Sequence, residues 1–148
     1  MQLNSKFVDT TNKISFQRRI NSLILHSEFR KNPVVVFNRL LVWELFKLIQ
    51  YKPTICIHKK SKMQLTPGKK RGVHGIIYIF RDECEPIVKY AINQYVRPGD
   101  ICYDIGANIG LWTLALSEIV GDSGFVYSYE PMSDNIQKFK KNLTISSN

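Results

Sequence analysis

Residues 101–130 read ICYDIGANIGLWTLALSEIVGDSGFVYSYE, and this stretch decides the fold. Its apolar runs at 101–105 and 125–129 predict two short strands. Between them, apolar residues at helical spacing predict a helix over 111–120. A strand, a helix and a second strand within 30 residues have the size of one βαβ unit, whose crossover makes the two strands parallel. We therefore expect an α/β fold built on a parallel sheet.

A glycine-containing turn, GANIG at residues 106–110, joins the first strand to the helix. Gly106 and Gly110 permit a tight turn and a close approach of the backbone to a ligand. The first amides of the following helix lack helical partners, so they suit a carboxylate or a phosphate. Because ligands of open α/β sheets bind beyond the carboxyl ends of the strands, we expect the binding site at the bend around Ala107.

Two carboxylates flank this turn. Asp104 lies on the strand just before the turn, where it could pair with a ligand ammonium group. Glu130 stands at the end of the second strand, 20 residues after Gly110, where it can accept two hydrogen bonds from a ribose diol. We predict that Glu130 and the bend around Ala107 face a common crevice.

These requirements fit S-adenosylmethionine, which has a carboxylate, an ammonium group, a ribose diol and a positively charged sulfonium. A dinucleotide-binding loop would normally follow the pattern G-x-G-x-x-G. Here Asn108 stands where the second glycine would be, and Asp104 lies two residues ahead of the turn. The pattern therefore favours the methyl donor over NAD, with a purely structural βαβ unit as the alternative.

At these residues the sequence resembles the FkbM family of S-adenosylmethionine-dependent methyltransferases. The resemblance covers roughly residues 83–143 and rests on three stretches, RPGDICYDIGANIGLWTL (97–114), GFVYSYEP (124–131) and KKNL (140–143). It implies a Rossmann-like class I methyltransferase fold. It also implies O-methylation of a hydroxyl on a small molecule or a sugar.

The same resemblance implies roles for particular residues. Glu130 would hold the ribose of the cofactor, and Glu85, an acid ahead of a helix, would be a weaker candidate for cofactor contact. The residues that would line the methionine end of the cofactor are Asp104, Gly106, Asn108 and Gly110. No residue stands out as a general base, so the catalytic residues stay unassigned.

The family fold needs further strands after the helix that begins at Ser133. Those strands would supply the adenine contacts, the acceptor pocket and any general base. Because the sequence stops at Asn148, we expect an incomplete methyltransferase domain that is inactive in isolation. The strand at 101–105 would then have one neighbour and a bare apolar edge.

The rest of the chain predicts an N-terminal region of helices and a small antiparallel β region over 1–82, followed by the cofactor-binding half-domain over 83–148. Asn32-Pro33 predicts the start of a helix, with asparagine as the N-cap and proline in the first turn. Pro53 ends that helix. The other expected elements are helices at 16–29 and 86–96 and strands at 54–58, 63–66 and 75–80.

The net charge of +9 is unevenly distributed. Residues 1–81 contain 16 Lys or Arg and 3 Asp or Glu, a net charge of +13, whereas residues 82–148 contain 5 and 9, a net charge of −4. A basic region can bind an anionic partner, but no nucleic-acid-binding module accompanies it. We therefore expect a small-molecule or glycan acceptor as the partner, no nucleic acid, and a membrane surface only as a less favoured possibility.

Cysteine usage and hydropathy indicate a cytoplasmic protein. Cys56, Cys84 and Cys102 are far apart, which argues against a disulfide framework and against a metal site. The start of the chain has no signal-peptide pattern. The apolar stretch at 34–49 is too short, and too often interrupted by charge, to span a membrane.

Two alternatives to a methyltransferase fragment remain open. One is a non-catalytic binding or interaction protein that keeps half of a cofactor domain and uses its basic N-terminal region on an anionic surface. The other is an RNA methyltransferase, which would explain the charge but lacks a recognition module.

Overall fold

The computed structural model describes residues 24–68 and 72–146, and the chain divides into two compact units, Met1–Asn38 and Arg39–Asn148. In the first unit the described residues form α2 (Ser27–Lys31) and the start of α3 (Pro33–Ile49). The helix expected at 16–29 falls partly on residues 16–23, which lie outside the described part. Where it is described, it is interrupted at His26, because the His26 side chain caps α2 by accepting a hydrogen bond from the Glu28 amide at 3.3 Å.

Helix α3 begins and ends near the predicted points. It starts at Pro33, and the amide of Val36 donates to the carbonyl of Asn32 at 3.1 Å. Its last residue is Ile49, and Gln50 follows with a φ of 55°, a conformation that leaves the helix. The helix start at Asn32-Pro33 is therefore confirmed.

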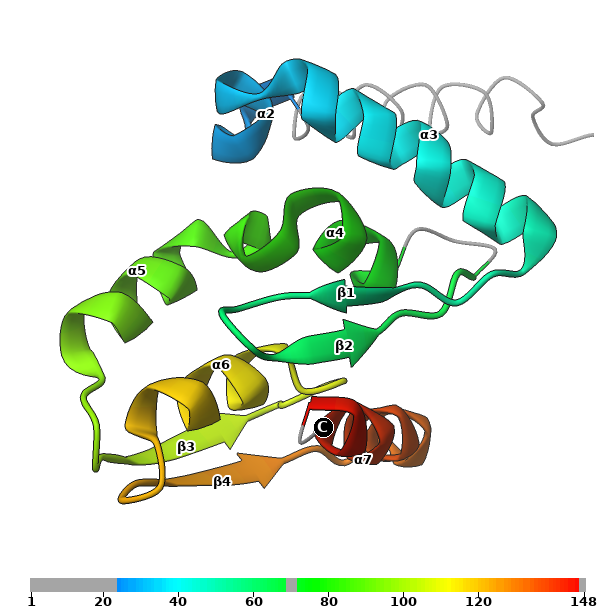
Figure 1. Ribbon diagram of the computed structural model, residues 1–148. Coiled ribbons are helices and arrows are strands. Elements are labelled where there is room, and N and C mark those ends of the chain that lie inside the picture. The colour runs from blue at the N-terminus through cyan, green and yellow to red at the C-terminus, as the bar shows by residue number, and fades with distance from the viewer. Residues whose placement is uncertain (1–23, 69–71, 147–148) are drawn as a thin grey trace, which may run out of the picture. The chain divides into compact units, whose positions relative to one another are not determined.

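The second unit contains the predicted βαβ unit. Strand β3 (Ile101–Ile105), helix α6 (Leu111–Val120) and strand β4 (Phe125–Tyr129) follow one another, and α7 (Ser133–Ser146) comes next. The two strands are parallel and in register over their whole length, with α6 lying along one side of them (Figure 1). The protein is thus a mixed α/β protein, as the sequence predicts.

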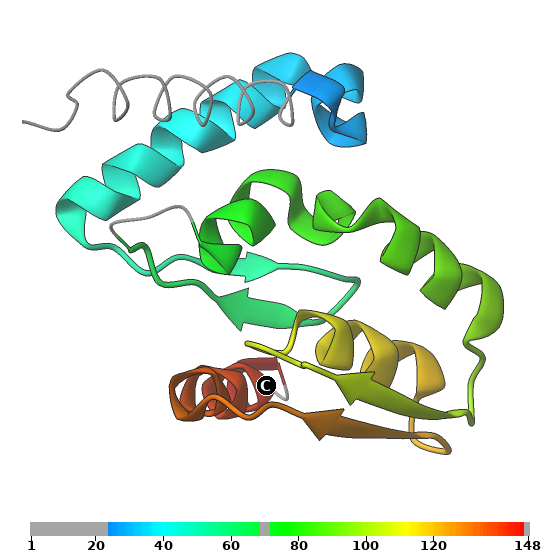
Figure 2. The ribbon, with the colours of Figure 1, turned by 180° about the vertical axis from the view of Figure 1, so that it is seen from behind.

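A small antiparallel hairpin is also present where the sequence predicts one. It pairs β1 (Thr54–Cys56) with β2 (Lys62–Gln64). Its buried side chains share one hydrophobic cluster with the glycine turn and α6, and Figure 2 shows the hairpin beside α6 and α7 from the opposite side. The cluster members from these parts are Ile55, Ile57, Met63, Leu65, Ile109, Leu111 and Leu114.

The strand expected at 75–80 is wrong, because these residues form helix α4 (Val73–Phe80). The helix starts after Gly72, whose carbonyl accepts hydrogen bonds from the amides of Gly75 and Ile76. A short apolar run cannot be assigned to strand or helix by periodicity alone. Here Ile77 and Tyr78 join the core while Ile76 on the same run is 41% exposed.

A 3-10 helix, η1 (Arg81–Cys84), leads from α4 into α5 (Pro86–Tyr95). The position of α5 matches the helix expected at 86–96. None of its residues is buried, and Ile87 and Tyr95 are 83% and 79% exposed. The apolar side chains of α5 therefore do not belong to the core.

Among the described residues, no helix is long and apolar enough to cross a membrane.

Candidate ligand-binding site at the glycine turn

The backbone of the turn between β3 and α6 has three residues with positive φ. Gly106, Asn108 and Gly110 have φ angles of 88°, 51° and 94°. Glycine enters this left-handed region without steric cost, and asparagine is among the side chains that tolerate it best. The residue types of the GANIG segment therefore follow from the conformation of the turn.

The turn is fixed to the end of β4 by its amides. The amides of Gly106 and Ala107 both donate to the carbonyl of Tyr129, at 2.8 and 2.9 Å. The amide of Asn108 donates to Oε2 of Glu130 at 2.9 Å. The structure thus places the Glu130 carboxylate against the bend, as the sequence predicts, although 22 positions separate the two residues.

The carboxylate of Glu130 accepts two further hydrogen bonds. They come from the amide of Met132 at 2.9 Å and from the side-chain amide of Asn135 at 3.2 Å. The bond from Met132, with those from Asn135 and Asn108, holds the pKa of Glu130 below its ordinary value against a smaller effect of desolvation. Because a carboxylate has about four acceptor positions, a diol that donates two hydrogen bonds would replace one of these donors.

The two glycines of the turn face different surroundings. A Cβ on Gly106 would meet no atom within 4 Å, so open space lies over this residue. A Cβ on Gly110 would overlap the ring of Phe139 from α7. Gly106 therefore leaves room for a ligand, whereas Gly110 is buried and is needed for packing.

Asn108 carries an unusual polar group. Its side chain is half-buried, and its Oδ1 is buried without a hydrogen-bond partner in the described structure. Buried polar atoms of native proteins are nearly always hydrogen-bonded. A ligand donor, such as an ammonium group, would satisfy this oxygen.

Asp104 points toward α6. Its Oδ2 accepts a hydrogen bond from the hydroxyl of Thr113 at 2.5 Å, and that hydroxyl lies 2.9 Å from the hydroxyl of Ser128. Thr113 is 5% exposed, so this group lies in the interior between α6 and the two strands. Ser128 was not anticipated from the sequence; the signal that could have found it is its parallel pairing with Asp104 on the neighbouring strand.

Glu85 directly precedes α5, and its side chain reaches the start of α6. Its carboxylate accepts a hydrogen bond from the indole N–H of Trp112, the second residue of that helix. The structure thus connects Glu85 to the helix that follows the turn. Its contact with a cofactor stays a prediction.

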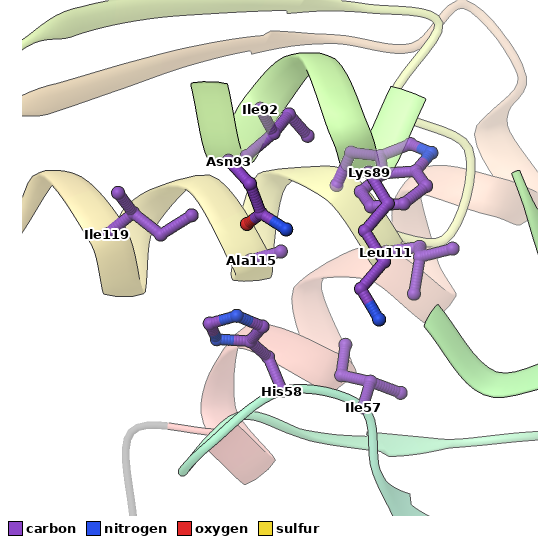
Figure 3. Close-up of a pocket in the computed structure, with 9 residues that line it drawn as sticks. Ile57, His58, Lys89, Ile92, Asn93, Leu111, Ala115 and Ile119 are labelled. Atoms are coloured by element: carbon purple, nitrogen blue, oxygen red, sulfur yellow. The ribbon is translucent and has the colours of Figure 1, made fainter. Parts of the chain in front are cut away.

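A separate small pocket is lined neither by Glu130 nor by residues 106–110. It is formed by the hairpin loop, α5 and the outer side of α6, as Figure 3 shows. Its cavity volume is about 10 Å³, room for about one water molecule. The pocket cannot hold a nucleoside, so we place the candidate site at the glycine turn on the geometry of its residues.

Among the described residues, no group of three or more His, Cys, Asp or Glu side chains is placed so that it could hold a metal ion. Comparisons of the chain with family models, with curated proteins and with solved structures find no significant match.

Proposed function

We propose that this chain carries the cofactor-binding part of an S-adenosylmethionine-dependent methyltransferase with a Rossmann-like class I fold. The observation that carries the proposal is the hydrogen bond between Glu130 and the amide of Asn108. This hydrogen bond joins the end of β4 to the turn that follows β3, the neighbouring parallel strand. This edge of an α/β sheet is where such folds bind ligands.

The residues of the turn fit the groups of this cofactor. Gly106 leaves open space above the backbone, and the unpartnered Oδ1 of Asn108 can accept a hydrogen bond from an ammonium group. Glu130 has a lowered pKa, so it is ionised at neutral pH and suits a ribose diol. We assign the methionine end to Gly106 and Asn108 and the ribose to Glu130.

Asp104 has a supporting role in this proposal. The hydroxyl of Thr113 holds its carboxylate at 2.5 Å and turns it toward α6. Its negative charge near the start of α6 favours a ligand ammonium group over a second carboxylate. A phosphate-binding turn would not gain from this charge, which supports the methyl donor over a dinucleotide.

When bound, S-adenosylmethionine supplies a methyl group on a positively charged sulfonium. The contribution of the described residues is to bind and orient, because much of the rate of such a transfer can come from alignment. The acceptor class, a small-molecule or sugar hydroxyl, rests on the resemblance to the FkbM family.

Calorimetric titration of the full chain with S-adenosylmethionine tests the proposal. We expect binding by the wild-type chain and a loss of about 10- to 100-fold in affinity for Glu130→Gln, because a hydrogen bond to a charged group is removed. Gly106→Ala should also weaken binding, since its methyl group enters the open space. Asp122→Asn, just beyond the end of α6 that lies opposite the turn, is the matched control.

Two results would contradict the assignment. One is an absence of binding by the wild-type chain at about 1 mM ligand, because a dissociation constant above this concentration is too weak for a cofactor site. The other is an equal affinity of the wild-type chain and Glu130→Gln. Circular dichroism of each variant checks that the chain is folded.

A further inference from the structure

The two oxygens of the Glu130 carboxylate have different numbers of hydrogen-bond donors. Oε1 accepts two hydrogen bonds, from the amide of Met132 at 2.9 Å and from the side-chain amide of Asn135 at 3.2 Å. Oε2 accepts one, from the amide of Asn108 at 2.9 Å. Each carboxylate oxygen has about two acceptor positions. The described contacts therefore fill both positions on Oε1 and one of the two on Oε2.

A ribose diol needs one acceptor position on each oxygen of the carboxylate. Its two hydroxyls are neighbours, so they can donate side by side to the two oxygens, as the paired N–H groups of an arginine do. On Oε2 of Glu130 the incoming hydroxyl can use the second position. On Oε1 it can bind only in place of Met132 or Asn135. The diol must therefore displace one of these two donors.

The two donors on Oε1 differ in how easily they can move. The amide of Met132 belongs to the residue just before α7, and the carbonyl of Met132 accepts the amides of Asn135 and Ile136, both at 3.0 Å. Moving the Met132 amide would disturb this first turn of the helix. The other donor is the half-buried side chain of Asn135, whose bond to Glu130 is the longest of the three. It can leave by rotating about its own side-chain bonds, with no change in the backbone.

We propose that the side chain of Asn135 holds the position on Glu130 that the ribose needs, and gives it up when the ribose diol binds. The inference rests on the proposed function, because it takes Glu130 as the acceptor of the ribose hydroxyls. Asn135 is then a positioning residue that orients the carboxylate beside the turn until the ligand replaces it. Because it competes with the ligand for Oε1, its side chain limits the affinity for the cofactor.

Calorimetric titration of the full chain with S-adenosylmethionine tests this role through Asn135→Ala. Alanine suits a helix, and the substitution removes the competing donor. We therefore expect an affinity equal to that of the wild-type chain or up to about 10-fold tighter, the effect of one hydrogen bond. Gln137→Ala removes an exposed amide from the same helix and is the matched control, which should leave the affinity unchanged. Asn135→Leu, which has a similar shape but no donor, repeats the test should the alanine variant not fold.

The pH dependence of the affinity separates this role from a merely structural one. The hydrogen bonds from Met132, Asn135 and Asn108 lower the pKa of Glu130 against desolvation, and no charged side chain of the described residues contributes. Loss of the Asn135 donor should raise this pKa in the free chain. Because the ionised carboxylate binds the diol, the affinity falls as the pH drops through the pKa of the free chain. The fall should therefore begin at a higher pH in Asn135→Ala than in the wild-type chain, whereas Gln137→Ala should follow the wild-type chain.

Two results would overturn this inference and leave the proposed function standing. One is an affinity of folded Asn135→Ala below that of the wild-type chain at neutral pH, which would make Asn135 a contact of the bound ligand. The other is a fall of the affinity at the same pH in both chains, which would mean that Asn135 does not act on Glu130. An absence of binding by the wild-type chain would instead overturn the proposed function, and this inference with it.

Discussion

Gly106 and Gly110 share a left-handed backbone conformation but have different roles. Both have φ near 90°, so either one would be strained by a side chain. Only Gly110 lies against another element, because the Phe139 ring of α7 occupies the space that its Cβ would need. Gly110 is therefore needed for the packing of α7 on the turn, whereas Gly106 has no such packing role and is part of the proposed ligand surface.

Substitution of each glycine by alanine should separate these roles. Gly106→Ala should lower the free energy of unfolding by about 1 kcal/mol, the cost of a left-handed alanine. Gly110→Ala should lower it by about 3 kcal/mol, because overpacking against Phe139 adds to that cost. Urea unfolding of the two variants measures the difference, and equal losses would show that Phe139 moves aside freely.

Sequence reasoning could place Asp104 and Glu130 beside the turn but could not identify their hydrogen-bond partners. Asp104 and Glu130 stand at strand ends, and the local pattern of a βαβ unit indicates which end binds ligands. The packing of Gly110 against Phe139 joins the turn to α7, and no local pattern encodes it. Ser128 cannot be identified from a local pattern either, because the register of the sheet is what places it beside Asp104 and within reach of Thr113.

At the scale of elements, one carboxylate attaches α6 to the hairpin loop. Glu118 accepts hydrogen bonds from the amide of Lys60 at 2.8 Å and from the hydroxyl of Ser61 at 2.8 Å, and it lies 3.1 Å from Nδ1 of His58. Burial raises the pKa of Glu118, but these hydrogen bonds together outweigh it and leave the pKa below the ordinary value of 4.5. The ionised carboxylate is thus the form that stabilises the contact.

This contact should make stability fall in acid. Because the pKa of Glu118 is lower in the folded than in the unfolded chain, its contribution is fully present above pH 4.5 and is lost as the pH falls through the folded value. Glu118→Gln should lower the free energy of unfolding at pH 7 by about 1–2 kcal/mol and reduce the loss in acid. Thermal melts from pH 7 to about pH 3, near the lower end of carboxylate titration, measure both effects.

Asp122→Asn, just beyond the end of α6, is the control for Glu118→Gln, since no described hydrogen bond involves the Asp122 side chain. It should leave the pH profile unchanged. A profile of Glu118→Gln that parallels the wild-type profile would mean that other carboxylates carry the acid sensitivity.

Elements were predictable where a boundary residue marks them. Pro33 and Pro86 begin α3 and α5, and the glycine turn separates β3 from α6. The run at 75–80 has no such internal mark, and its β-branched residues suit a strand. It is helical because a helix brings Ile77 and Tyr78 into the core beside Trp43, with the rings of Trp43 and Tyr78 stacked at 5.2 Å.

At the scale of the whole molecule, the core of the second unit draws on both sides of residue 82. Met63 and Leu65 from the hairpin are fully buried with Ile109 of the turn. The Asn142 side chain of α7 accepts a hydrogen bond from the Gln64 amide at 2.9 Å and donates one to the carbonyl of Ile109 at 2.9 Å. The hairpin thus completes the core around the turn. The predicted division of the chain into 1–82 and 83–148 can be tested by asking whether the second segment folds without the hairpin.

The segment 83–148 should not fold alone. Its 66 residues lie near the size at which a single core is marginal, and without the hairpin Ile109 and Leu114 lose the apolar side chains that cover them. We expect the isolated segment to show little helical circular dichroism and no cooperative melt. Residues 39–148, which match the second unit, should keep a cooperative melt and are the control. If 83–148 melts cooperatively by itself, the hairpin is an accessory to an independent half-domain, and the division at residue 82 is the correct one.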